Sequence, residues 1–150
     1  MSDNITSILN DLVEISKDGE KGFRAAANDT KNAELQAVFL PRAQDCATGA
    51  ADLQQLVARL GGNPEKGGSL TGAVHRGWVN LKAAVSARTD LAILEECERA
   101  EDVAKASYRK ALEKKLPEDI RVVVQSQYDG VLRNHDQIRA LRDRYRAKQS

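Results

Sequence analysis

The sequence has no excess of charge of one sign and no long apolar run. Its 23 lysine and arginine residues nearly balance 22 aspartate and glutamate residues, which leaves a formal net charge of +1. Dedicated nucleic-acid binders usually concentrate positive charge on one face, so this balance argues against nucleic acid as the main partner. No stretch approaches the roughly 20 apolar residues that a membrane-spanning helix needs. The N-terminus also lacks the basic start and apolar run of a signal peptide. We therefore expect a cytoplasmic protein with no membrane partner.

Cysteine is also scarce. The two cysteines, Cys46 and Cys97, are far apart and lack CxxC spacing, so neither a zinc site nor a disulfide framework is indicated. Both fall on apolar stripes, where a free cysteine commonly behaves as a small hydrophobe. With 150 residues, of which 41% are apolar and 30% charged, the composition is that of one globular domain, residues 1–150.

Apolar residues recur at steps of three and four along most of the chain, which is the pattern of amphipathic helices. Four long helices are expected, at about 4–28, from the turn at 28–30 to about 60, at about 90–114 and at about 117–146. Asp3 and Thr89 are the predicted N-caps of the first and third helices, and Pro117 the predicted first residue of the fourth. Pro41 should kink or split the second helix. Gly19 and Gly22 should permit close approach of a neighbouring helix.

A polar, glycine-rich connector at 61–88 separates the second and third helices. It contains a shorter expected helix at 70–85, with Trp78 as an apolar anchor. His75 and Arg76 could bind an anion, although an exposed helix face explains them better. One long crossover between two hairpins is the ferritin-like arrangement. The predicted fold is therefore all-α: a ferritin-like four-helix bundle of two antiparallel hairpins, joined by a long crossover that contains a short helix.

Two polar side chains, Glu101 and His135, stand on otherwise apolar stripes of the third and fourth helices. Because those helices should be antiparallel neighbours, the two side chains are expected to face each other. A carboxylate and an imidazole, with Cys97 and Cys46 as neighbours, would suit a single iron, zinc or copper ion. The alternative is a buried, mutually satisfied pair that fixes helix register, since buried polar groups need partners.

The motifs of a catalytic centre are missing. A di-iron carboxylate site takes a glutamate from each of two helices and an ExxH motif from each of the other two. The chain contains no ExxH: Leu132 stands three residues before His135, and Ala43 three before Cys46. It also contains no P-loop, nucleophile elbow or dinucleotide fingerprint. A redox di-iron centre is therefore not expected, and we lean towards a protein that is not an enzyme.

An acidic cluster lies on the third predicted helix. It comprises Glu95, Glu96 and Glu98, together with Glu101 and Asp102. Such a cluster could attract cations. More often it is a solvated face, whose expected partners here are Arg99, Lys105 and Arg109.

Several segments, taken as a set, resemble a bacterial family of uncharacterised ferritin-like four-helix-bundle proteins that is classed as a domain of unknown function. The segments are Leu9-Asn10-Asp11-Leu12, Lys17-Asp18-Gly19-Glu20, Asp52-Leu53-Gln54, Leu60-Gly61-Gly62, His75-Arg76-Gly77-Trp78, Glu98-Arg99-Ala100-Glu101-Asp102 with Tyr108, and Asn134-His135-Asp136. The resemblance covers essentially the whole chain. It implies a ferritin-like bundle with distant kinship to rubrerythrin-like and stress-associated bundles, and it brings no established activity.

The metal site that the resemblance suggests has only two candidate ligands here, Glu101 and His135. The predicted function is a non-catalytic, stress-associated structural or interaction protein with a degenerate metal site, which forms a homo-oligomer. The alternative is a single-metal-binding protein or a metal-linked oxidoreductase. A third hypothesis is an adaptor that uses the face around Trp78 to bind a protein partner, which the sequence does not identify.

Overall fold

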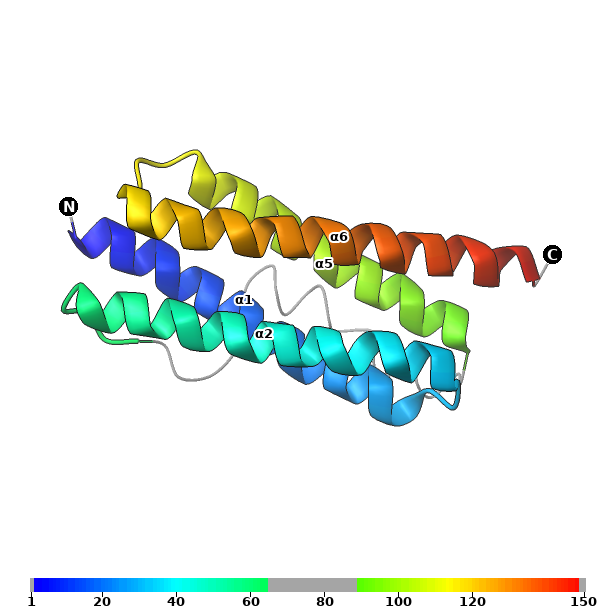
Figure 1. The fold of residues 1–150 in the computed structure, drawn as a ribbon. Coiled ribbons are helices and arrows are strands. Elements are labelled where there is room, and N and C mark those ends of the chain that lie inside the picture. The colour runs from blue at the N-terminus through cyan, green and yellow to red at the C-terminus, as the bar shows by residue number, and fades with distance from the viewer. Residues whose placement is uncertain (1, 65–88, 149–150) are drawn as a thin grey trace.

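The computed structural model describes residues 2–64 and 89–148, and within these ranges the chain forms four α-helices and no strand. Helix α1 spans Ser2–Asp29, α2 spans Ala33–Arg59, α5 spans Asp90–Leu112 and α6 spans Glu118–Lys148. Figure 1 shows two antiparallel hairpins, α1–α2 and α5–α6, packed against each other. The predicted all-helical architecture with four long helices is confirmed. The expected helix at 70–85, with His75, Arg76 and Trp78, lies outside the described residues.

Local sequence accounts for both ends of α2. The side-chain oxygen of Asn32 accepts hydrogen bonds from the backbone N–H groups of Glu34 and Leu35, at 2.8 and 3.2 Å. This is the N-cap arrangement that satisfies otherwise unpaired donors of the first turn. At the other end, Gly61 has φ 83° and the N–H of Gly62 donates to the Val57 carbonyl at 3.0 Å. Glycine adopts this left-handed conformation without strain, and α2 therefore ends in a Schellman motif.

Some predicted boundary details are wrong. Helix α1 begins at Ser2, so Asp3 lies inside its first turn instead of capping it. The Pro117 carbonyl accepts from the N–H of Arg121 at 2.8 Å, which makes Pro117 the residue before α6 and not its first residue. Thr89 does occupy the N-cap position of α5, but its side chain makes no capping hydrogen bond. Helix α2 continues through Pro41 without splitting, because buried Phe39 and the following turns hold it against the core.

Contacts at the helix ends fix how the hairpins are paired. Arg59 at the end of α2 forms an ion pair with Asp119 at the start of α6, at 2.8 Å. Thr30, in the turn between α1 and α2, donates to the Asp90 carboxylate at the start of α5, at 2.7 Å. The end of α2 and the start of α5 therefore lie at opposite ends of the bundle (Figure 1).

The core consists of two apolar clusters, one towards each end of the bundle. The first is centred on Leu9, Leu12, Leu53, Val57, Ile120 and Val124. The second is centred on Phe23, Leu35, Phe39, Ile93, Leu94 and Ile138. Between the clusters, buried polar side chains come from the middle of the helices, among them Ser16, Glu101 and Asn134. We call this middle level of the bundle the polar layer.

Candidate functional site in the central polar layer

Glu101 is the most deeply buried charged side chain of the polar layer, with 2% of its surface exposed. Its Oε1 atom accepts from Arg42 Nε of α2 at 3.1 Å and from Asn134 Nδ2 of α6 at 2.9 Å. Its other oxygen, Oε2, is buried and has no hydrogen-bond partner among the described residues. Three helices therefore meet at one carboxylate, and only one of its two oxygens is satisfied by the residues described.

The charges of Glu101 and Arg42 compensate each other. Burial raises the pKa of Glu101, and the nearby Arg42 charge and the hydrogen bonds from Arg42 and Asn134 oppose that rise. Burial works against the charge on Arg42, yet the Glu101 carboxylate raises the pKa of the guanidinium overall. Arg42 also lies over the Phe23 ring, 5.9 Å from its centroid, which gives the cation an aromatic partner. The pair is charge-neutral within the protein itself.

A second chain of hydrogen bonds crosses all four helices in the same layer. Tyr108 of α5 donates to Gln127 Oε1 of α6 at 2.8 Å, and Ser16 of α1 lies 3.2 Å from the Tyr108 oxygen, to which it then donates. Gln127 Nε2 in turn donates to the Gly49 carbonyl of α2 at 3.2 Å. Burial raises the pKa of Tyr108 to about 12, so the phenol is neutral and acts as a donor. Such a fully connected network fixes helix register.

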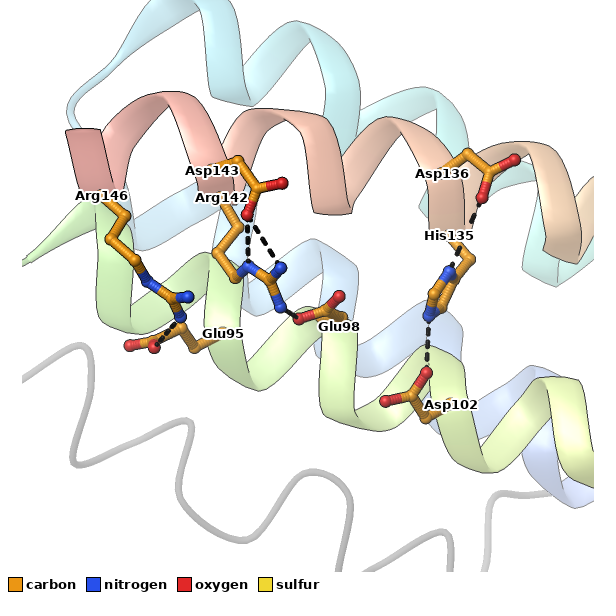
Figure 2. Close-up of polar contacts among 8 residues, drawn as sticks. All are labelled: Glu95, Glu98, Asp102, His135, Asp136, Arg142, Asp143 and Arg146. Carbon is orange, nitrogen blue, oxygen red and sulfur yellow. Dashed lines mark hydrogen bonds and ion pairs between the residues drawn. The ribbon is translucent and has the colours of Figure 1, made fainter. Parts of the chain in front are cut away.

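The predicted direct contact between Glu101 and His135 is wrong by one residue on each helix. Glu101 bonds Asn134, whereas His135 Nε2 lies 2.5 Å from Asp102 Oδ1 and His135 Nδ1 lies 3.9 Å from Asp136 Oδ1. Consecutive helical residues point about 100° apart. Glu101 and Asn134 therefore turn into the core, while Asp102 and His135 meet at the α5–α6 seam (Figure 2).

The acidic cluster of α5 pairs mainly across this seam. Figure 2 shows Glu95 with Arg146, Glu98 with Arg142, and Asp102 with His135, in antiparallel order along α5 and α6. The prediction that the cluster pairs within its own helix holds for Glu96 with Arg99. It is wrong for Glu95, Glu98 and Asp102, because α6 presents its basic side chains at the same levels.

Both cysteines belong to the core, as free thiols. Burial raises the pKa of Cys46 to about 12 and the pKa of Cys97 well above its usual value. The Glu101 charge raises both pKa values further. The thiols are therefore protonated, which makes them poor nucleophiles and poor metal ligands in this arrangement. Cys46 also lies against Gly19: a Cβ atom built on that glycine would stand 3.0 Å from the Cys46 sulfur. This confirms the predicted close approach at Gly19.

A cavity of about 310 Å³ lies in the polar layer and opens between α2 and α6. We call it the central cavity. Its inner wall includes Ser16, Arg42, Glu101 and Tyr108, together with apolar side chains of all four helices. Its mouth is lined by polar and small residues spaced three or four apart on the two helices. These are Asp45, Thr48, Gly49 and Asp52 on α2, and Ser126, Gly130 and Arg133 on α6.

The arrangement does not form a ready metal centre. Among residues 2–64 and 89–148, no group of three or more His, Cys, Asp or Glu side chains is placed to hold an ion. Glu101 has a guanidinium where a metal ion would compensate its charge, and His135 turns to the seam. Glu101 and His135 remain predicted metal ligands, but they would have to change partners to meet at one ion.

Sequence reasoning missed Arg42 and Asn134, the two partners of Glu101. A signal for both is present in the helical spacing. Arg42 stands seven residues after buried Leu35, and Asn134 three after buried Val131, so both lie on core-facing stripes. A lone charged or amide residue on such a stripe needs a buried partner. Together with Glu101 these positions predict a polar cluster.

The fold and the polar layer define a four-helix-bundle protein with a charge-neutral polar centre. Residues 4–114 match the family model described as "Domain of unknown function (DUF2383)", and the chain therefore belongs to that family. No curated protein matches the chain. In the part of the chain that the structure describes, no helix is long and apolar enough to cross a membrane.

Proposed function

We propose that the protein is a non-catalytic bundle that acts through binding, and that its polar layer is a structural element completed by Arg42 in place of a metal ion. The observation that carries this proposal is the bond from Arg42 to Glu101, at 3.1 Å. A buried carboxylate that already has a cationic partner does not require an ion for charge balance. The protonated state of Cys46, Cys97 and Tyr108 also favours a role without nucleophilic chemistry.

A ferritin-like topology with one long crossover is part of the same proposal. It is supported by the opposite positions of the end of α2 and the start of α5, because the linking residues have to bridge the length of the bundle. The association with stress rests on the sequence resemblance. It predicts that the amount of the protein in the cell rises when growth is challenged by heat, oxidants or starvation.

The alternative function is the binding of a single metal ion. It is favoured by the buried Glu101 Oε2 atom, which has no hydrogen-bond partner among the described residues. Binding at this oxygen would place a second cation next to Arg42, and the repulsion between the two charges would weaken the binding.

Metal analysis of protein purified without an affinity tag separates the two functions. Our proposal predicts less than stoichiometric iron, zinc or copper, and no change in metal content in Glu101→Gln. Asp143→Asn is the matched control, because Asp143 is an exposed carboxylate on α6 whose ion pair is with Arg142. One metal ion per chain, lost in Glu101→Gln or His135→Ala but retained in the control, would overturn the proposal in favour of the alternative.

A further inference from the structure

The central cavity contains donors and charges that the described residues leave unused. Arg42 uses its Nε–H on Glu101, while its two terminal nitrogens have no acceptor among the residues described. Arg42 also lines a second, adjoining hollow between α2 and α6, which shares Asp45, Gly130 and Arg133 with the central cavity. A guanidinium fork with free N–H groups matches the geometry of a carboxylate.

The mouth of the cavity has acidic and basic sides. Asp45 and Asp52 lie on α2, and Arg133 lies opposite on α6. None of the three forms an ion pair within residues 4–64 and 89–148. The inner Arg42–Glu101 pair is already neutral, and the mouth offers unpaired groups of both signs. A ligand that carries both a carboxylate and a cationic group can match both.

Part of the remaining wall is apolar. Ile15, Phe23, Val103, Ala104 and Val131 face the same cavity. A volume of about 310 Å³ is at the small end of the range for ligand pockets, which suits a compact molecule. The cavity therefore combines a carboxylate-binding fork, carboxylates for a cationic group and an apolar wall.

We propose that the central cavity binds a small zwitterion of the α-amino acid class with an apolar side chain. Arg42, assisted by Arg133, holds its carboxylate, and Asp45 faces its ammonium group. Its side chain packs against the apolar wall. The inference rests on the proposed function, because it requires that Arg42, and no metal ion, occupies the polar layer.

Three probes of matched shape test the proposal on the full, metal-free chain: leucine, 4-methylpentanoate, which lacks the ammonium group, and 3-methylbutylamine, which lacks the carboxylate. Binding is followed through backbone amide shifts in ¹H–¹⁵N spectra. Leucine should shift the signals of Gly49 and Gly130, which line the mouth, and each truncated probe should bind at least ten-fold more weakly. Equal binding of all three probes, or no response to leucine at millimolar concentration, would overturn the inference.

Two cavity variants, Gly130→Leu and Asp45→Asn, and one control, Ala140→Leu, test whether leucine binds in the cavity. In Gly130→Leu a side chain fills the mouth, and its Cβ has room because the nearest side-chain atom is 3.7 Å away. This variant should lose the leucine response, whereas Ala140→Leu, at an exposed α6 position outside the cavity, should keep it. Asp45→Asn should weaken leucine binding and leave 4-methylpentanoate binding unchanged. Retained leucine binding in both cavity variants would contradict the proposal.

Stoichiometric metal in the purified protein would overturn the proposed function, whereas failure of leucine to bind the metal-free chain overturns only this inference.

Discussion

Glu101 is the central residue of the polar layer, because its buried carboxylate binds side chains of two other helices. Its negative charge is compensated by Arg42 and its Oε1 atom is further satisfied by Asn134, but burial still raises its pKa. The folded state therefore holds the Glu101 proton more tightly than the unfolded chain does. The raised pKa adds to the free energy of unfolding. This contribution is fully present below the usual glutamate pKa of about 4.3, and it is lost as pH rises through the raised pKa.

Substitution Glu101→Gln removes this titration and keeps the shape of the side chain. Near pH 7 the variant loses the charge partner of Arg42, and we expect its free energy of unfolding to fall by about 1–3 kcal/mol. On acidification towards pH 4.5 the wild type should gain stability relative to the variant, because only the wild type takes up this proton on folding. Urea unfolding of both proteins across this pH range measures the difference. A difference that stays constant or reverses with pH would show that Glu101 has no raised pKa.

The packing of α1 against α2 depends at one point on the absence of a side chain. A Cβ atom at Gly19 would lie 3.0 Å from the Cys46 sulfur and 3.8 Å from the Cys46 Cβ. Alanine is favoured over glycine inside a helix by about 1 kcal/mol. The close contact with sulfur should cancel that gain in Gly19→Ala.

A double substitution tests this contact between α1 and α2. With Cys46→Ala in place, Gly19→Ala should stabilise the protein by about 1 kcal/mol, since only the sulfur stands in the way. In the wild-type background, the same substitution should be neutral or destabilising. Thermal unfolding of the four proteins gives both effects. Equal effects of Gly19→Ala in the two backgrounds would show that α1 and α2 do not meet closely here.

The helices themselves were predictable from sequence, because their apolar residues recur at helical spacing and their ends carry strong signals such as Gly61. The partners of Glu101 were not predicted, because helical spacing places Arg42 and Asn134 on core-facing stripes but does not determine which buried polar residues meet. Glu101 and Asp102 are adjacent, and only the packing decides which of them faces Arg42 and which faces His135. The central cavity could not be predicted from the sequence either, because it results from the way in which four helices pack around small residues.

For the whole molecule, self-association remains a prediction. In the described part of the chain the large exposed apolar side chains are Leu40 and Val122, at 50% and 58% exposure, on different helices. Single exposed residues of this kind are ordinary on a monomer surface. We expect sedimentation equilibrium to give a mass above that of one chain, and Leu40→Glu to lower that mass if α2 lies in the interface. A monomer at all concentrations would contradict the prediction.

We propose that Arg42, in place of a metal ion, compensates the charge of Glu101 inside the bundle. A double-mutant cycle in protein treated with a chelator tests it most directly, with Arg42→Met, Glu101→Leu and the combined variant. Each single substitution leaves one buried charge unpaired and should lower the free energy of unfolding by about 3–5 kcal/mol, whereas the double variant should lose much less than the sum. Additive losses would contradict this proposal, because they would mean that the two side chains do not stabilise each other.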